Sequence, residues 1–544
     1  MLVKNYDKLI IFSAVLVTLI FTPTNFDALI IPKVAIAFCT SLFVLPELFI
    51  QLKSNFQNLK IYRSLIIIFC WAIIHLVIII IFSNAPLEQQ IFGRTGRGFG
   101  LITYISFLIF LFASVVFFSI KNINLIVIGL AISTIISGTY AILQKHSLDL
   151  FAWDSKTNGI IGTLGNPNFQ SSLAVAGVVS LLVLAGKSKL KLVLITLSAG
   201  FSLYLVYICQ ATQGYLGLVA AMLILLAVWY WQKNKLVFFG LLLFSALGAG
   251  MAILGMLGKG PLAYYLYKVS VQSRGDFFRS AFTTANEFPL TGVGLDSFGD
   301  HYLRNRDSIA ANHPFAELTD NAHNYFLEFA ATGGYPFAFL YALLLLLSLI
   351  CFLKIINQNK SFDKNITSVF CAWVIFQLQS LISPGSISIM LWNFIICGAI
   401  IGIYIKGLNG VTQLKPARPN NSFAIVGALL LILGLTLVYP WFNSDRLIRV
   451  GLEQGNANIL IQEVNSYPRF VNKFRLIGLR LLEANLTPQA LEVAKQAIKF
   501  NPEAISGWAL ILYNPTAEQT DREKARAEIL RLDPWNKEVL LYKY

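Results

Sequence analysis

The stretch "DNAHNYFLEFAATGGYP", residues 320–336, places a histidine at the start of a strongly hydrophobic segment. Asp320 or Asn321 is expected to be the N-cap of the helix that follows, which puts His323 in its first turn. The partial positive charge of a helix N-terminus disfavours an imidazolium ion. We therefore expect His323 to be neutral at physiological pH and able to act as a general base. A histidine that only forms hydrogen bonds at the membrane interface is the alternative.

Further polar groups surround this histidine in the sequence. Asn324 and Glu328 are four residues apart, so they share one face of the expected helix. In the preceding polar segment, Arg274 and Arg279 have aromatic and apolar residues between them in "SRGDFFRSAF". This pattern predicts an amphipathic helix, and the later "PLTGVG" predicts a glycine turn after it. The whole segment, residues 258–323, has about as many carboxylates as basic groups. Any role for arginine there must depend on individual positions.

The composition indicates a protein embedded in a membrane by many helices. Of its 544 residues, 56% are hydrophobic and only 13% are charged, and the mean hydropathy is +0.67. A soluble protein has roughly 25% charged residues. The fold class expected is therefore an all-α, polytopic helical bundle of about 12–13 transmembrane helices. The net charge of +15 is explained by orientation in the membrane, so we expect no nucleic acid as partner. The six cysteines form no CxxC pair, which argues against a metal site or a disulfide framework.

Thirteen apolar runs are long enough to be candidate spans, and lysine and arginine recur in alternate loops between them. Positively charged loops stay on the cytoplasmic side, so the pattern predicts a cytoplasmic N-terminus and an extracytoplasmic C-terminus. A loop as long as residues 258–323 is expected to fold on itself and to have a function. The candidate spans are centred near residues 16, 43, 73, 110, 133, 179, 200, 223, 247, 340, 375, 396 and 432.

The composition changes near residue 443, which suggests a division into residues 1–442 and 443–544. The second part has mixed charge, and Pro468, Pro502 and Pro534 are spaced at 34 and 32 residues. This spacing and the helical pattern resemble tetratricopeptide-type hairpins. Such hairpins offer a groove for a protein partner, but a helical cap without a ligand is equally consistent with the pattern.

Few polar residues lie at the centres of the candidate spans. Transporters place ionisable groups at that depth, whereas here the main exceptions are neutral or singly placed and are expected to be hydrogen bonders between packed helices. These exceptions are His75, Gln377, Gln379 and Asn393. The pattern favours chemistry at the outer face, with a transporter or flippase and a non-catalytic membrane scaffold as alternatives.

Several motifs in one order resemble a known family. His323-Asn324 followed by Gly334 resembles the signature of the O-antigen ligase and O-antigen polymerase superfamily of bacterial membrane proteins. The remaining matching segments are "GRTGRGFGLITY" (93–104), "GTLGNPNFQSSLA" (162–174), "QATQGYLGL" (210–218) and "SRGDFF…FPLTGVGLDSF" (273–298). The resemblance covers most of residues 1–440 and implies a fold similar to that of membrane-embedded glycosyltransferases, termed GT-C-like.

The resemblance implies an activity at the outer face of the cytoplasmic membrane of the cell. Members of this family transfer a sugar chain from undecaprenyl pyrophosphate to an acceptor hydroxyl of a lipid, a glycan or a protein. By this resemblance His323 is the base, Arg274 the principal clamp on the pyrophosphate, and Asn324 an orienting group. The other residues that we expect to bind substrate are Arg279, Arg94, Arg97, Gln213 and Glu328. No metal and no cofactor is expected, because arginines supply the charge and Asp296 and Asp300 are not spaced as a DxD pair.

The sequence departs from the family pattern at two positions within the membrane part. The stretch Thr212-Gln213-Gly214 has Gln213 where the family usually has an arginine, so either Arg94 or Arg97 compensates or the donor is bound differently. Phe337 stands where the pattern has Gly, Thr or Tyr, which affects helix packing more than chemistry. The sequence leaves the choice between ligase and polymerase open; the tail, which could present an acceptor, favours a ligase.

Overall fold

The structure is a computed structural model that describes residues 5–56, 60–149, 151, 160–186, 188–313, 317–358, 362–408 and 421–541. Over these residues the chain forms 24 α-helices and one short 3-10 turn, η2 (Gly162–Leu164), with no β-strand. The prediction of an all-α helical bundle is confirmed.

Each of the thirteen predicted spans coincides with a helix. They are α1 (Tyr6–Leu19), α2 (Ile30–Phe56), α3 (Lys60–Phe82), α5 (Leu101–Phe117), α6 (Asn124–Lys145), α7 (Pro167–Ala185), α8 (Lys191–Cys209), α9 (Thr212–Lys233), α10 (Lys235–Met256), α15 (Tyr325–Gln358), α16 (Lys364–Ser380), α17 (Ile387–Leu408) and α18 (Asn421–Glu453). In the described part of the chain, ten of these helices are long and apolar enough to cross a membrane. The others, α1, α5 and α16, have 14, 17 and 17 residues. At 1.5 Å per residue they are shorter than a hydrocarbon core of about 30 Å.

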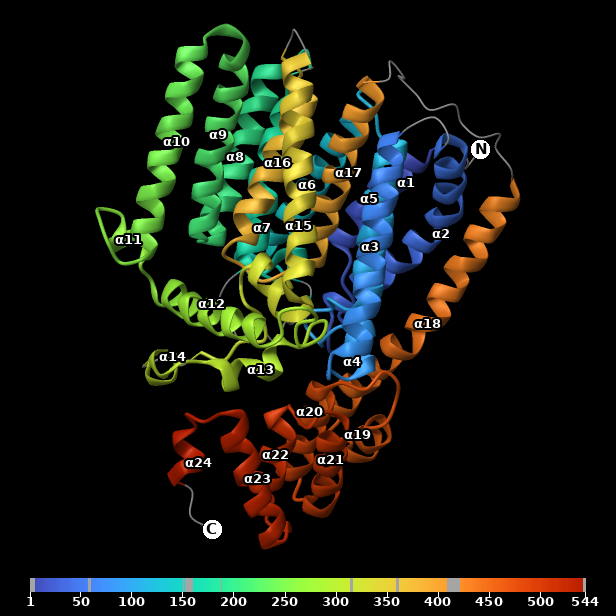
Figure 1. Ribbon diagram of the computed structural model, residues 1–544, viewed down its shortest axis with the longest axis vertical. Coiled ribbons are helices and arrows are strands. Elements are labelled where there is room, and N and C mark those ends of the chain that lie inside the picture. Colours follow the sequence, from blue (N-terminus) through green and yellow to red (C-terminus); the bar gives the residue numbers. More distant parts are fainter. Residues whose placement is uncertain are drawn as a thin grey trace.

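The core of the bundle surrounds α17, which packs against α5, α15, α16 and α1. Its apolar window is 94% buried, whereas that of α10 is not buried at all. A helix that is apolar on every side and, among the described elements, packs mainly against α9 and α11 is suited to contact with lipid. Figure 1 shows α10 at the edge of the bundle, with α9 beside it.

The long polar segment folds on itself at one end of the bundle, as predicted. It contains α11 (Ala263–Leu266), α12 (Val269–Glu287), α13 (Phe298–Asn305) and α14 (Ser308–Asn312), and α4 (Leu87–Phe92) lies at the same end. Phe277 of α12 and Phe298 of α13 share a small hydrophobic core with Ala331 of α15. This core fixes the segment to the helix that follows the histidine.

The helices after the bundle lie beyond this end, and the N-terminus lies at the opposite end (Figure 1). They are α19 (Ala457–Glu463), α20 (Val471–Glu483), α21 (Thr487–Phe500), α22 (Ile505–Leu512), α23 (Gln519–Leu532) and α24 (Lys537–Leu541). The helices α20 and α21 pair around Phe474 and Ile477, and α22 and α23 pair around Trp508 and Ile529. The suggested division at residue 442 falls inside α18, so the helix is continuous across it. The tetratricopeptide assignment stays a prediction.

Candidate active site

The helix after the histidine begins later than the sequence predicts. Asn324 is its N-cap, because its Oδ1 accepts hydrogen bonds from the backbone N–H groups of Phe326 (3.0 Å) and Leu327 (3.1 Å). The prediction that Asp320 or Asn321 is the N-cap is therefore wrong, and His323 precedes the helix instead of lying in its first turn. The physical reason is that His323 has a left-handed backbone, with φ of 55°, which no helical turn allows.

Two side chains fix this short turn. The Oδ1 atom of Asn321 accepts from the N–H of His323 at 2.8 Å, which closes a local side-chain turn. The Oε2 atom of buried Glu328 accepts from the N–H of Ala322 at 2.7 Å. Glu328, which we predicted to bind substrate, thus has one carboxylate oxygen occupied in holding the turn that carries the histidine.

The imidazole of His323 is held in one tautomer. Its Nδ1 lies 3.1 Å from the carbonyl oxygen of Asn321, and a carbonyl only accepts hydrogen bonds, so Nδ1 carries the proton. In the neutral ring the Nε2 atom then has the free electron pair. The ring packs against Phe277 of α12, with ring centroids 5.0 Å apart. A neutral Nε2 of this kind can accept a proton.

The surroundings of His323 keep it neutral. Burial first, and then the positive charge of Arg97, lower its pKa from 6.5 to about 4, and Arg274 acts in the same direction. The neutral state is as predicted, but the dominant cause is desolvation and not a helix terminus. The structure therefore brings three of the predicted residues close together: His323, Arg97 and Arg274.

Arg97 is fixed by a carboxylate beside the histidine. Its Nε and Nη2 atoms donate to Oδ1 of Asp320, at 2.9 and 2.5 Å. Burial opposes ionisation of Asp320, but Arg97 and Arg94 outweigh it and lower its pKa to about 2. The aspartate is thus charged at any physiological pH. The pair holds the guanidinium of Arg97 in one place next to the imidazole.

Arg94 and Arg97 lie on a glycine-rich loop, residues 93–99, whose backbone is held by two buried aspartates. Oδ2 of Asp296 accepts from the N–H groups of Arg94 (2.6 Å) and Phe99 (2.9 Å). Oδ2 of Asp27 accepts from the N–H of Gly96 at 2.7 Å. Burial raises the pKa of Asp296 to about 6, against the effect of these hydrogen bonds. The loop is compact enough to require glycine: a Cβ at position 93 would lie 2.5 Å from the carbonyl carbon of Gly98.

The side chain of Arg94 points away from solvent toward α13. Its Nη1 donates to Oδ1 of Asp300 at 2.8 Å, and its buried Nε has no acceptor among the residues that the structure describes. An unpaired buried donor costs about 1–3 kcal/mol. Sequence reasoning missed the holding roles of Asp27, Asp296 and Asp300, because only their partners, far away in sequence, reveal them.

The two arginines of α12 have different partners. Arg274 is half-buried and has no hydrogen bond or ion pair to any described residue; burial lowers its pKa, with Glu317 acting in the opposite direction. Arg279 is exposed and donates to Asp307 (2.5 Å) and Asp276 (2.7 Å). Arg274 is therefore the arginine of this helix whose charge is available to an anion, and Arg279 ties α12 to α14.

The polar groups at Gln213 and Asn324 serve a neighbouring turn. Nε2 of Gln213 donates to the hydroxyl of Ser383 at 2.7 Å, and that hydroxyl lies 3.0 Å from Oε1 of Gln213. Nδ2 of Asn324 donates to the carbonyl of Leu381 at 3.1 Å. Both residues thus hold the connection between α16 and α17. The predicted roles in orienting or binding substrate stay predictions, since neither side chain has a hydrogen bond to the His323 ring in the described structure.

The helix α15 is broken about three turns after its start. Gly334 has φ of 76° and ψ of 170°, a region that is essentially accessible to glycine alone. The break frees backbone groups, and the large loop satisfies them: the N–H of Tyr335 donates to Pro289 (2.8 Å). The freed carbonyls of Ala331, Thr332 and Gly333 are paired with the N–H of Val293 (2.9 Å), the N–H of Gly294 (3.1 Å) and Nε2 of His75 (2.8 Å). The glycine turn of the loop is thereby fixed against α15, and His75 is the hydrogen bonder between helices that we predicted.

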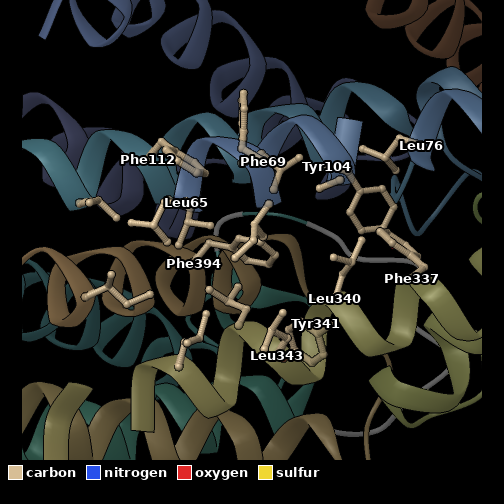
Figure 2. A pocket seen from close by; sticks show the side chains of 18 of the residues that line it. Leu65, Phe69, Leu76, Tyr104, Phe112, Phe337, Leu340, Tyr341, Leu343 and Phe394 are labelled. Atoms are coloured by element: carbon tan, nitrogen blue, oxygen red, sulfur yellow. The ribbon is translucent and has the colours of Figure 1, made fainter. Parts of the chain in front are cut away.

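An apolar groove begins beside this break. Side chains from α3 and α5 face those of α15 across it (Figure 2), and the space between their atoms, open solvent included, is about 840 Å³. Phe337, Tyr104 and Phe329 line the end nearest the histidine, and Leu65 and Leu347 lie toward the other end. Phe337 packs 4.9 Å from Phe329 and 5.2 Å from Tyr104 between ring centroids. The departure from the family pattern at Phe337 thus contributes to the wall of the groove.

Comparison with known proteins finds a family similarity over part of the chain. Residues 197–343 match the family described as O-antigen ligase, a stretch that includes Gln213, Arg274, His323 and Gly334. The glycine-rich loop and the C-terminal helices lie outside the match. A comparison with curated proteins found no match to this chain. The predicted resemblance to the O-antigen ligase superfamily is confirmed by this match: residues 197–343 of this multi-pass membrane protein are similar to the O-antigen ligase family.

Proposed function

We propose that the chain is a glycan ligase that transfers an oligosaccharide or polysaccharide from undecaprenyl pyrophosphate to an acceptor hydroxyl. The observation that carries the proposal is the neutral His323 with a free Nε2 beside Arg274, whose charge has no carboxylate partner in the described structure. The family match supports glycan transfer in general. An O-antigen-type polymerase, which differs in its acceptor, is the alternative within the same chemistry.

In the proposed reaction, Nε2 of His323 takes the proton of the acceptor hydroxyl as its oxygen attacks the anomeric carbon. The bond from that carbon to the pyrophosphate oxygen breaks, and the electron pair leaves with undecaprenyl pyrophosphate. This leaving group is a stable anion, so it needs positive charge more than a proton. Guanidinium groups match phosphate oxygens in bidentate fashion, and Arg274 and Arg97 would supply them. No step requires a metal ion.

The apolar groove supports a lipid-linked donor. Apart from the ring hydroxyls of Tyr104 and Tyr341, its walls are aliphatic and phenyl side chains. A polyprenyl chain gains about 0.8 kcal/mol for each CH₂ that it buries in such an environment. Tyr325 follows His323 by two residues and begins α15. Phe329 lies about 6 Å further along this helix. We propose that the groove receives the polyprenyl chain and that the pyrophosphate lies toward His323.

The location of the polar groups also favours an enzyme over a transporter or flippase. Two polar side chains near the span centres pair with each other: Gln377 Nε2 donates to Asn393 Oδ1 at 2.6 Å, and both contact the hydroxyl of Tyr341. The charged cluster lies at the end of the bundle where the C-terminal helices are. We propose that this end faces outward from the cytoplasmic membrane, with the N-terminus in the cytoplasm.

The test uses purified protein in detergent or liposomes with a glycan–pyrophosphate–undecaprenol donor and candidate lipid, glycan and protein acceptors. Release of undecaprenyl pyrophosphate together with a glycosylated acceptor is the expected result. Replacing a general base typically costs a factor of about 10²–10⁴ in rate, so His323→Ala should show such a loss. Arg274→Ala should raise KM for the donor more than Arg279→Ala does, because Arg279 is already paired. Full activity of His323→Ala would refute the proposed mechanism.

A further inference from the structure

The carboxylate that holds Arg94 is itself held by the C-terminal helices. The side chain of Asp300 in α13 is only 4% exposed. Its Oδ1 accepts from Arg94, and its Oδ2 accepts from Nε2 of Gln89 (3.2 Å) and from Nδ2 of Asn501 (3.0 Å). Asn501 follows α21 directly and is also buried. One carboxylate thus joins the glycine-rich loop, α4, α13 and the C-terminal helices.

A buried ion pair fixes α13 to the same helices. Nη2 of Arg306, the residue after α13, donates to both oxygens of Asp533, at 2.8 and 3.0 Å. The two side chains are only 9% and 3% exposed. Nδ2 of Asn536 also donates to Asp533, at 3.2 Å. Surface ion pairs contribute little, but a buried pair is strongly sensitive to loss of one partner, so this contact is specific to the docked arrangement.

The helix that precedes the glycine-rich loop also contacts the chain after α17. The helix α4 leads directly into the loop, and its Glu88 accepts from Nε of Arg469 at 2.8 Å. Phe92, the last residue of α4, packs edge-on against Trp441 and Tyr467, with ring centroids 5.3 and 5.4 Å apart. The chain after α17 therefore contacts two segments next to Arg94. One is α4, which leads into the loop of Arg94, and the other is α13, which carries Asp300.

We propose that the C-terminal helices position the donor site, and that Asp300, Asn501 and Asp533 are positioning residues. They act by holding Arg94, and with it the glycine-rich loop that carries Arg97. The inference rests on the proposed function, because that function takes Arg97, on the same loop, as a ligand of the pyrophosphate. A long guanidinium side chain must be fixed to bind phosphate oxygens well, and small misplacements have large effects in such sites. A groove for a protein partner is not needed to explain why these helices are attached here.

A charge swap tests the inference. Arg306→Asp and Asp533→Arg each place like charges together and should undock the C-terminal helices, whereas the double variant restores an opposite pair. Asn501→Ala is a milder variant that removes one hydrogen bond to Asp300. Arg480→Asp, at an exposed pair with Glu483 on α20, is the matched control. Docking is followed by limited proteolysis, and the donor site by the Kd of undecaprenyl pyrophosphate, which requires no turnover.

We expect each single reversal to weaken binding of undecaprenyl pyrophosphate tenfold or more and to speed cleavage of the C-terminal helices, with recovery of both in the double variant. Asn501→Ala should weaken binding by a smaller factor, and the control should bind as the wild type does. Should a reversal fail to fold, Asn501→Ala decides. Faster proteolysis with unchanged binding, or normal binding by Asn501→Ala, overturns the inference. If the wild type binds the lipid but transfers no glycan, the proposed function falls while the positioning role stands.

Discussion

Lowering the pH of the reaction tests the proposed base directly. His323 has a pKa near 4, against an ordinary 6.5. At about pH 5.5 a group with the lower pKa is about 97% neutral, whereas an ordinary histidine is only about 9% neutral. If His323 is the base, kcat/KM for the donor should therefore stay nearly constant from neutral pH down to about pH 5.5. An ordinary histidine would already have lost about tenfold there.

Two substitutions near the His323 ring should shift its pKa in opposite directions. Arg97 lowers the pKa of His323 through its charge, and Asp320 raises it. Arg97→Met should therefore move the acid limb of kcat/KM to higher pH, and Asp320→Asn should move it to lower pH. Burial is the largest cause of the low pKa, so neither substitution alone should return the limb to 6.5. The rate itself will fall in Arg97→Met, but the position of the limb does not depend on its amplitude.

The assay measures initial release of undecaprenyl pyrophosphate at low donor concentration, since kcat/KM reports the ionisation of the free enzyme. The residual reaction of His323→Ala, followed over the same pH range, reports the ionisation of the donor alone and is subtracted. A wild-type limb near pH 6.5 would mean that the ring is solvated in the working protein. Limbs that move together in the two variants would show that the charges of Arg97 and Asp320 do not act on this group.

Two further predictions concern the helix break and the source of positive charge. Gly334→Ala should destabilise the protein by at least about 1–3 kcal/mol, because its backbone conformation is strained for any other residue and a Cβ would lie 2.4 Å from the backbone of Leu290. Thermal unfolding in detergent measures this loss. The control is Gly248→Ala in α10, which should not be destabilising because nothing lies within 4 Å of the added Cβ. Transfer should persist in excess EDTA and gain nothing from added Mg²⁺ or Mn²⁺, since arginines supply the charge; loss with EDTA and recovery with either ion would contradict the mechanism.

The membrane helices can be predicted from sequence because a span must have about 20 apolar residues. Hydropathy therefore locates even α5, where Leu101–Phe117 covers the expected centre near residue 110. The association of His323 with Arg274 can be predicted only through the family resemblance, since 49 residues separate them. The family motif identifies residues by position, and it needs no knowledge of the path that brings them together.

The local geometry of the site cannot be predicted in this way. Three residues before α15 are able to cap a helix, and the choice of Asn324 depends on the left-handed turn at His323. The break in α15 has a sequence signal in Gly333, Gly334 and Pro336, but its stability depends on hydrogen bonds from a turn some forty residues earlier. Long-range pairing of backbone groups leaves no local pattern in a single sequence.

The charges of the site explain how a histidine with such a low pKa can serve as a base. Arg97 is balanced by Asp320, and Arg94 by Asp300, so that in the described structure Arg274 is the nearby cation without a carboxylate partner. A pyrophosphate beside Arg274 adds negative charge close to the ring, and a nearby opposite charge raises the pKa of an imidazole. A general base works best when its pKa approaches the working pH. In the proposed mechanism, donor binding would thus make His323 more basic only when the sugar to be transferred is present, while the free protein keeps the ring neutral.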